Sequence, residues 1–239
     1  MATTLLIRHA QASFGAAVYD QLSGLGIRQA RLAGEYLATT IGPVARITCG
    51  RLTRQRATAT ELAAKVRTAQ GVAPDIEIDP RLDELDIDGH MQRFVAELND
   101  PRGSLAGHFA AAKTSSRSYL KVIHRVFTHW QAVAEEPGLE SWRAFAARTR
   151  AVVQDIACTS VSGETTIAVS SGAVIATIVQ GILGLPAAGV YPLFEAMMNC
   201  SITRLLHTRE RISLATFNET GYLAAMGARA GETNLLTYL

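Results

Sequence analysis

The chain has 239 residues, 48% of them hydrophobic, which is enough to bury one sizeable core. The formal net charge is only +2 and the arginines are scattered, so a nucleic-acid-binding protein is not expected. The cysteines are odd in number and far apart, which disfavours a disulfide framework or a Cys-Cys metal site and fits a reducing compartment: Cys49, Cys158 and Cys200.

The N-terminal sequence MATTLLIRHA lacks the basic region and long apolar run of a signal peptide. Residues 165–194 carry no charge and are long enough to span a bilayer. They are interrupted by Gly184, Pro186 and Gly189, which favours a buried strand, a turn and a buried helix instead. We therefore expect a cytoplasmic protein with no membrane partner.

The first 80 residues alternate between strand and helix patterns. Short apolar runs with β-branched residues predict three strands, at residues 3–8, 44–49 and 75–78. Apolar residues at three- and four-residue spacing predict two helices, at residues 24–40 and 52–70. This alternation predicts an α/β fold, a three-layer sandwich in which a mostly parallel sheet has helices on both faces.

The middle of the chain is predicted to be helical, over residues 91–98, 118–134 and 141–157. The second and third of these helices carry apolar stripes that we interpret as core-facing. The segment from about residue 88 to residue 140 is then a helical insertion between two strands of the sheet. We expect this insertion to cap the functional site as a lid.

The last third of the chain returns to a strand at residues 166–170 and a helix at 173–183. Two β-rich runs, 199–207 and 211–217, predict a hairpin at the edge of the sheet. We expect residues 1–239 to form a single domain. The edge hairpin offers a surface for a homodimer, but edge strands are usually protected in other ways, so the oligomeric state stays open.

Arg8 and His9 directly follow the first predicted strand. Ligands of open parallel sheets bind beyond the carboxyl ends of the strands. An imidazole there is a fair nucleophile at neutral pH, and an adjacent guanidinium can hold phosphate oxygens. The dipeptide alone is weak evidence, because a surface Arg-His pair after a strand usually has no function.

Two further signals follow the next strands. Arg54 lies in the first turn of the second predicted helix, where exposed amides favour an anion. The alternative, a basic helix start in solvent, is electrostatically unfavourable. Glu84 follows the third strand and suits a general acid if burial or its neighbours Asp83, Asp86 and Asp88 raise its pKa. The alternative for Glu84 is a solvated acidic loop.

Together these segments resemble the histidine phosphatase (phosphoglycerate mutase-like) superfamily. Its motifs are Arg-His-Gly after a strand, Ser-x-Leu-x-Arg-x-x-Gln-Thr-Ala at a helix start, Leu-x-Glu, and Val-Ser-His-Gly-Gly-Val-Ile. Counterparts occur in the same order at Arg8–Ala10, Gly50–Ala59, Leu82–Glu84 and Val169–Ile175, so the resemblance covers roughly residues 3–185. It implies that His9 is the nucleophile, that Arg8 and Arg54 bind phosphate, and that Glu84 protonates the leaving oxygen.

Four residues depart from the family pattern: Ala10, Gly50, Ala57 and Ser171. Ser171 stands at the position of the second catalytic histidine, where it can bind phosphate but brings no charge. Losing one preorganised donor of this kind costs about 2.7–4 kcal/mol, roughly a hundred- to thousandfold in rate. The candidates for compensation are His90, His108 and His124 in the insertion.

A bacterial branch of the family also resembles this chain in its departures. That branch has Gln-Ala-Ser-Phe-Gly after the first motif, Ser-Gly in place of His-Gly, and a later Ser-Leu-x-x-Phe-Asn. The corresponding segments here are Gln11–Gly15, Ser171-Gly172 and Ser213–Asn218. Ser171 is therefore interpreted as a feature of a branch and not as an isolated change.

The resemblance implies a phosphomonoester hydrolase that acts on a small phosphorylated substrate through a phosphohistidine at His9. Two arginines neutralise charge in this scheme, so neither a metal ion nor another cofactor is expected. Ser171 leaves open a catalytically weak phosphate-ligand binder or regulatory protein. A phosphoglycerate mutase ranks below hydrolysis, because nothing in the sequence of the insertion argues for keeping the phosphoryl group from water.

Overall fold

A computed structural model describes the chain except for residues 16–18, 96, 99–103, 113–114, 134–136 and 239. Its centre is a sheet in the order β3-β2-β4-β1-β5-β6. The strands are β1 (Ala2–Arg8), β2 (Val44–Cys49), β3 (Ile76–Ile78), β4 (Thr165–Ser170), β5 (Ile202–His207) and β6 (Ile212–Glu219). The first four in sequence run parallel, whereas β5 and β6 are antiparallel to their neighbours. The predicted mostly parallel sheet is thus confirmed.

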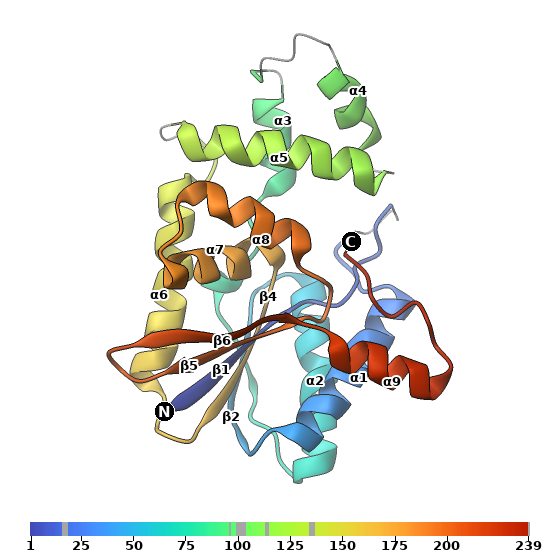
Figure 1. Ribbon diagram of the computed structural model, residues 1–239, viewed down its shortest axis with the longest axis vertical. Coiled ribbons are helices and arrows are strands. Elements are labelled where there is room, and N and C mark those ends of the chain that lie inside the picture. Colours follow the sequence, from blue (N-terminus) through green and yellow to red (C-terminus); the bar gives the residue numbers. More distant parts are fainter. Residues whose placement is uncertain (16–18, 96, 99–103, 113–114, 134–136, 239) are drawn as a thin grey trace.

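Two hydrophobic clusters cover the two faces of this sheet. Leu5 and Ile7 of β1 point to one cluster, and Leu6 points to the other, as the alternation of side chains along a strand requires. The first cluster is closed by α1 (Gly24–Thr40), α2 (Thr53–Gln70) and α9 (Gly221–Ala230). The second is closed by α6 (Trp142–Thr159), α7 (Gly172–Leu183) and α8 (Val190–Ala196). Figure 1 shows the resulting three layers, which confirms the predicted fold class.

Three helices stand between β3 and α6 in sequence: α3 (Ile87–Phe94), α4 (Ser104–Ala111) and α5 (Ser116–Ala132). Figure 1 shows them together at the top, beyond α7 and α8. The ring of Phe127 on α5 stacks on Phe194 of α8 at 5.4 Å between centroids. The hydroxyl of Tyr191 donates to the Leu120 carbonyl at 3.0 Å. The predicted insertion is therefore attached to the rest of the protein through an aromatic seam on α8.

Some predicted elements differ from the structure. The helix predicted at 91–98 begins four residues earlier, because the carboxylate of Asp86 caps it by accepting from the Gly89 amide at 3.0 Å. Three helices of 7 to 10 residues were not predicted, namely α4, α8 and α9, and in α8 and α9 no side chain caps the first turn. Short helices of this kind are stabilised by tertiary packing, which the sequence pattern does not reveal.

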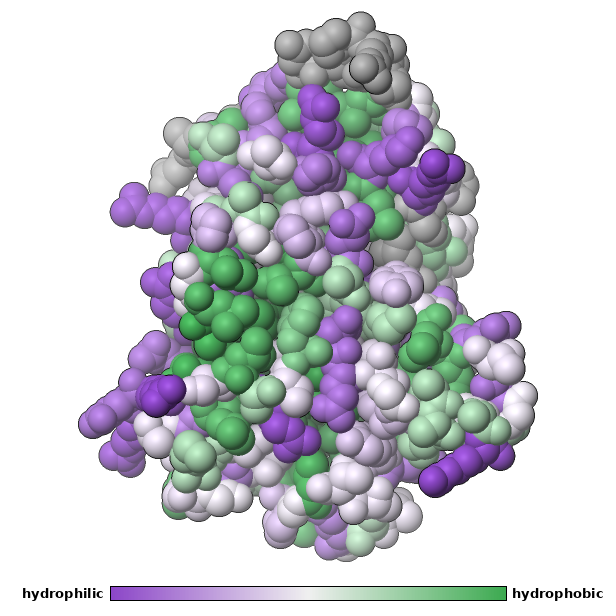
Figure 2. All heavy atoms as spheres, viewed as in Figure 1, coloured by the Kyte–Doolittle hydropathy of each residue, from purple (hydrophilic) through white to green (hydrophobic). Residues whose placement is uncertain are grey.

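The apolar stretch at 165–194 forms β4, α7 and α8. The predicted strand and helix are present, and α8 is an additional helix. Within the described ranges, the helices are too short or too polar to cross a bilayer. In Figure 2, apolar atoms gather over the part of the surface where Figure 1 places α7 and α8. Leu183 and Leu185, at the end of α7, are 49% and 37% exposed.

A close backbone contact fixes the segment that follows His9. A Cβ at Gly26 of α1 would lie 2.1 Å from the carbonyl oxygen of Gln11, so only glycine fits there. We expect Gly26→Ala to lower the free energy of unfolding by about 1–3 kcal/mol, a Tm loss of about 2–4 °C per kcal/mol. Gly24→Ala in the same helix is the control, since a Cβ there meets nothing within 4 Å. Equal Tm values for the two variants in calorimetry would contradict this packing.

Candidate active site

The residues singled out from the sequence gather at one edge of the sheet. Arg8 ends β1 and pairs in register with Ser170, which ends the parallel strand β4. His9 directly follows β1, and Ser171 directly follows β4. Arg54 lies in the first turn of α2, just beyond the end of β2. Carboxyl ends of parallel strands meet at the same edge, which is the usual ligand-binding side of such a sheet.

His9 is buried and presents one nitrogen to the site. Its Nδ1 lies 2.8 Å from the carbonyl oxygen of Ala10, which can only accept, so Nδ1 carries the proton. Nε2 then carries the lone pair of the ring, which accepts from Nε of Arg54 at 3.1 Å. Burial, followed by the charges of Arg54 and Arg8, lowers the pKa of His9 well below its ordinary value. His9 is therefore a neutral imidazole with its nucleophilic nitrogen on the side of the arginines.

Arg54 is held by the carboxylate of Asp20. Its Nη1 donates to Oδ1 of Asp20 at 2.7 Å, and the amide of Thr53 donates to the other oxygen at 2.8 Å. Its guanidinium carbon lies 5.4 Å from the centre of the Tyr19 ring. Asp20 thus supplies the anion that a basic helix start requires. Sequence analysis missed Asp20, because it lies 33 residues before the helix that it caps.

Arg8 is also buried, at 6% exposure, and only part of its guanidinium is bonded. Its Nη1 donates to the carbonyl oxygen of Met197. Its Nε has no hydrogen-bond partner in the described part of the chain. Because an unpaired buried donor is costly, this nitrogen is available for an anion. The amide groups of Asn218 hold the Met197 segment through Met198 and Ala196 at 2.9 and 2.8 Å, which gives the Ser213–Asn218 segment a structural role.

Glu84 lies beyond the short 3-10 helix Pro80–Leu82, and its carboxylate reaches the start of α7. Its two oxygens accept from the amides of Leu85 at 3.0 Å and Ala173 at 3.2 Å. Burial raises the pKa of Glu84, and this outweighs the lowering by those amides, Arg54 and Arg8. The expected crowding by acidic neighbours is not the main cause. Asp83 is paired with Arg51 at 2.6 Å, and Asp86 caps α3.

Ser171 is completely buried at the N-cap of α7. Its Oγ accepts a hydrogen bond of 2.8 Å from Nε2 of Gln55, a residue that sequence analysis did not single out. The signal for Gln55 was its place beside Arg54 on a helix whose buried face is otherwise small or apolar. Among the residues that the structure describes, no group of three or more His, Cys, Asp or Glu side chains is arranged to hold a metal ion.

The sequence matches the family model for the histidine phosphatase superfamily (branch 1) over residues 4–126 and 112–220. The chain belongs to the histidine phosphatase superfamily. No curated protein is similar enough in sequence to count as a match. Among solved structures, the fold is shared with mycobacterial glucosyl-3-phosphoglycerate phosphatase, at 24% identity and a TM-score of 0.60 over 91% of this chain and 99% of that one.

A second solved relative is phosphoserine phosphatase from Entamoeba histolytica, a mutant in complex with phosphoserine. It is 17% identical to this chain, with a TM-score of 0.63 over 93% of this chain and 100% of that one. At these identities the two structures establish a common fold. The chain covers nearly the full length of both of these structures.

The insertion histidines that were candidates to replace a second catalytic histidine are engaged elsewhere. His90 is buried with both ring nitrogens on backbone carbonyls, of Asp86 at 2.7 Å and Glu140 at 3.0 Å. His108 contacts the Ser118 hydroxyl at 3.2 Å, and the His124 ring lies 4.5 Å from that of Tyr191. In the described part of the chain, none of these three histidines forms a hydrogen bond with His9, Arg8 or Arg54.

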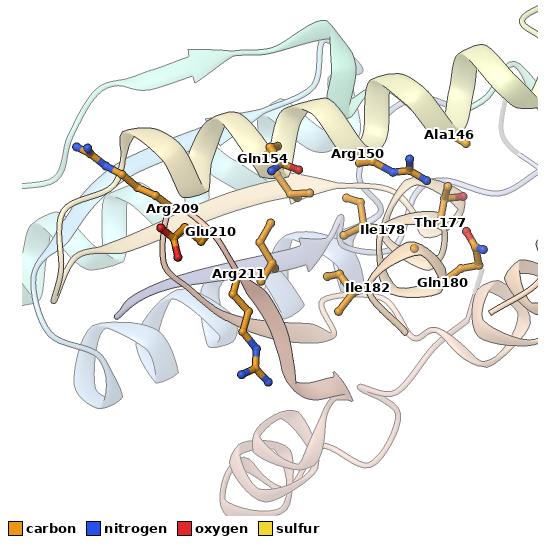
Figure 3. A pocket seen from close by; sticks show the side chains of 13 residues that line it. Ala146, Arg150, Gln154, Thr177, Ile178, Gln180, Ile182, Arg209, Glu210 and Arg211 are labelled. Carbon is orange, nitrogen blue, oxygen red and sulfur yellow. The ribbon is translucent and has the colours of Figure 1, made fainter. Parts of the chain in front are cut away.

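A hollow of 290 Å³ lies between α6, α7 and the β5–β6 turn, on the side of the sheet where β1 begins and so opposite the candidate site. That turn adjoins the start of β1, because Ala2 pairs with His207. In Figure 3 the side chains of Arg150, Arg209 and Arg211 point in different directions and do not converge on the hollow. The arrangement offers no common anion-binding point, in contrast to Arg8 and Arg54.

Proposed function

We propose that this protein is a phosphomonoester hydrolase that acts through a phosphohistidine at His9. The observation that carries the proposal is the geometry of His9 and Arg54. The Nδ1 proton is held by the Ala10 carbonyl at 2.8 Å, and Nε2 lies 3.1 Å from a guanidinium nitrogen. A lone pair held beside a cationic donor suits attack on a bound phosphoryl group.

In the first step, the lone pair of His9 Nε2 forms a bond to phosphorus while the bond from phosphorus to the leaving oxygen breaks. Glu84 transfers its proton to that oxygen, so a neutral alcohol leaves and Glu84 becomes a carboxylate. The pKa of Glu84, raised by burial, favours the protonated acid that this step needs. The Ala10 carbonyl then stabilises the positive charge that the phosphorylated imidazole acquires.

In the second step, water attacks phosphorus and gives its proton to the Glu84 carboxylate. The bond from phosphorus to Nε2 breaks, its electrons return to the imidazole, and inorganic phosphate leaves. Arg54 and the unpaired Nε of Arg8 bind the phosphoryl oxygens throughout, and the Ser171 hydroxyl adds a neutral donor. We propose that these groups neutralise enough charge for turnover without a metal ion.

The substrates proposed are small phosphorylated metabolites, in keeping with the relatives named for glucosyl-3-phosphoglycerate and phosphoserine. Helices α3 to α5, within the insertion at about 88–140, would cover the leaving group. We also propose, from Ser171 and Gly172, that the chain belongs to a bacterial branch in which Ser-Gly replaces His-Gly. Phosphate release from an aryl phosphate and a metabolite panel tests the function, and complete inactivity would contradict it.

One observation favours a second candidate, a phosphate-ligand binding protein with weak turnover. Ser171 supplies no positive charge, and His90, one of the candidates for compensation, has both ring nitrogens on backbone carbonyls. This candidate wins if a phosphorylated ligand raises the Tm yet is recovered unchanged. A mutase stays the weakest candidate. Isomerisation of a phosphoglycerate faster than phosphate release would favour it.

Glu84→Gln should discriminate between substrates by their leaving groups. An alkyl alcohol needs protonation to leave, so we expect its phosphate ester to lose about 10²–10⁴-fold in kcat. A nitrophenyl ester should lose much less, because nitrophenolate leaves without a proton. Activity of the unaltered protein should fall as pH rises through the raised pKa of Glu84, and this alkaline fall should vanish in the variant.

The matched control for Glu84→Gln is Asp88→Asn, an exposed acid four residues later. It should leave both substrates and the pH profile unchanged. Equal losses of Glu84→Gln on both esters in steady-state assays would show that Glu84 is not the proton donor.

A further inference from the structure

The Gln55 side chain is completely buried, and both its amide nitrogen and its amide oxygen are hydrogen-bonded. Its Nε2 donates to the Leu82 carbonyl at 2.9 Å and to the Ser171 hydroxyl oxygen at 2.8 Å. Its Oε1 accepts from the amide of Leu52 at 3.3 Å. The side chain therefore joins the start of α2, the segment before Glu84 and the end of β4. A buried amide needs its donors and its acceptor satisfied, and the partners of Gln55 come from three separate segments.

The contact fixes the direction of the Ser171 hydroxyl. An amide N–H can only donate, so the serine oxygen must accept from Gln55 and keeps its own proton for another acceptor. Ser171 directly precedes Gly172, where an added Cβ would lie 3.7 Å from the unpaired Arg8 Nε. Ser171 is thus adjacent in sequence to a residue that lies beside the unpaired guanidinium donor.

Gln55 also explains a second departure from the family motifs. A Cβ at Gly50 would lie 2.0 Å from Gln55 Oε1 and 2.8 Å from Asp83 Oδ1. The serine that the family carries at this position would collide with the glutamine amide. Gly50 and Ser171, far apart in sequence, therefore both contact the space that Gln55 occupies.

We propose that Gln55 is a positioning residue that orients the Ser171 hydroxyl as a donor to the phosphoryl group. Gly50, Gln55 and Ser171 act as one unit in place of the second histidine. The inference rests on the proposed function only for its kinetic readout. Gln55 itself does not touch the substrate, and it acts through Ser171.

A double-mutant cycle tests this unit, with Gln55→Met, Ser171→Ala and the double variant compared with the unaltered protein. We expect Gln55→Met to lower kcat about 10- to 100-fold with little change in KM, because a transition-state donor loses its orientation. The double variant should then have the kcat of Ser171→Ala. Losses that multiply, or a Gln55→Met variant with unaltered kcat, would overturn the proposal.

Gln55→Glu inverts the polarity of the contact. A carboxylate would accept the serine proton and turn the hydroxyl lone pairs toward the phosphoryl oxygens, so kcat should fall at least as far as in Ser171→Ala. The control is Gln70→Met on the same helix, where the amide bonds the backbone of residues 41–44. It should leave kcat unaltered. If the Gln55 variants do not fold, wild-type kcat in Ser171→Ala would by itself overturn the proposal.

Orthovanadate affinity, measured by calorimetry, separates this inference from the proposed function. Absence of His9-dependent turnover would refute the hydrolase alone. The positioning unit would still predict weaker vanadate binding in Gln55→Met and no further weakening in the double variant. Additive losses of vanadate affinity would overturn the unit even in an active enzyme.

Discussion

His9→Ala is expected to lower kcat by roughly 10⁴-fold or more, the range for loss of a covalent nucleophile. The imidazole is the group whose Nε2 carries a lone pair beside Arg54, and its Nδ1 is already committed to Ala10. Alanine leaves a small cavity and removes the atom that would bond to phosphorus. Phosphate release under saturating substrate, with protein folding checked by circular dichroism, measures the effect.

His124→Ala is the matched control for His9→Ala, since it removes an exposed imidazole from α5. It should keep the kcat of the unaltered protein. Substrate binding to His9→Ala should persist, because Arg8 and Arg54 stay in place. Residual turnover of His9→Ala at more than a tenth of the original rate would contradict covalent catalysis by His9.

Arg54→Lys is expected to lower kcat/KM about 10²–10³-fold although the charge is kept. The guanidinium donates to His9 through Nε and to Asp20 through Nη1, and lysine cannot reproduce this planar pair of donors. The exposed neighbour Arg56 is the control, and Arg56→Lys should have no effect. Equal activity of Arg54→Lys and the unaltered protein would show that the paired donors of the guanidinium are not needed.

Arg54→Met should in addition raise the pKa of His9. The charge of Arg54 is the second cause that lowers this pKa, after burial, so removing it favours the protonated imidazole. A protonated His9 is not a nucleophile, and activity should therefore be lost at a higher pH on the acidic side of the profile. Titration of the His9 ring signal by NMR measures the shift, and an unchanged or lower pKa would contradict the electrostatic account.

Much of the fold could be predicted from periodicity. Helix α1 has the predicted bounds, and the strands β1, β2 and β4 start or end within one residue of them. Those elements are long or strongly patterned and end at glycine, proline or polar caps. Helices α8 and α9 escaped prediction because their stability comes from partners such as Tyr36, which stacks on Tyr222 at 4.5 Å, and not from local sequence.

The grouping of the candidate site residues could be predicted from the motifs. His9, Arg8, Arg54, Glu84 and Ser171 lie at the same edge of the sheet because each follows the end of a parallel strand or opens the next helix. Gln55 and Asp20 were not predictable, since their roles depend on contacts across 116 and 34 residues of sequence. A motif specifies the residues at its own positions only. The distant polar groups that contact those residues are determined by tertiary packing.

Acid-quench trapping of the phosphoenzyme tests the central claim most directly. The protein is mixed with a substrate that it turns over, quenched within milliseconds, and the phosphorylated peptide is identified by mass spectrometry under alkaline conditions that preserve phosphohistidine. The account predicts one phosphoryl group on His9, absent from His9→Ala. Turnover without any phosphoryl group on His9, or with the label on another residue, would contradict it.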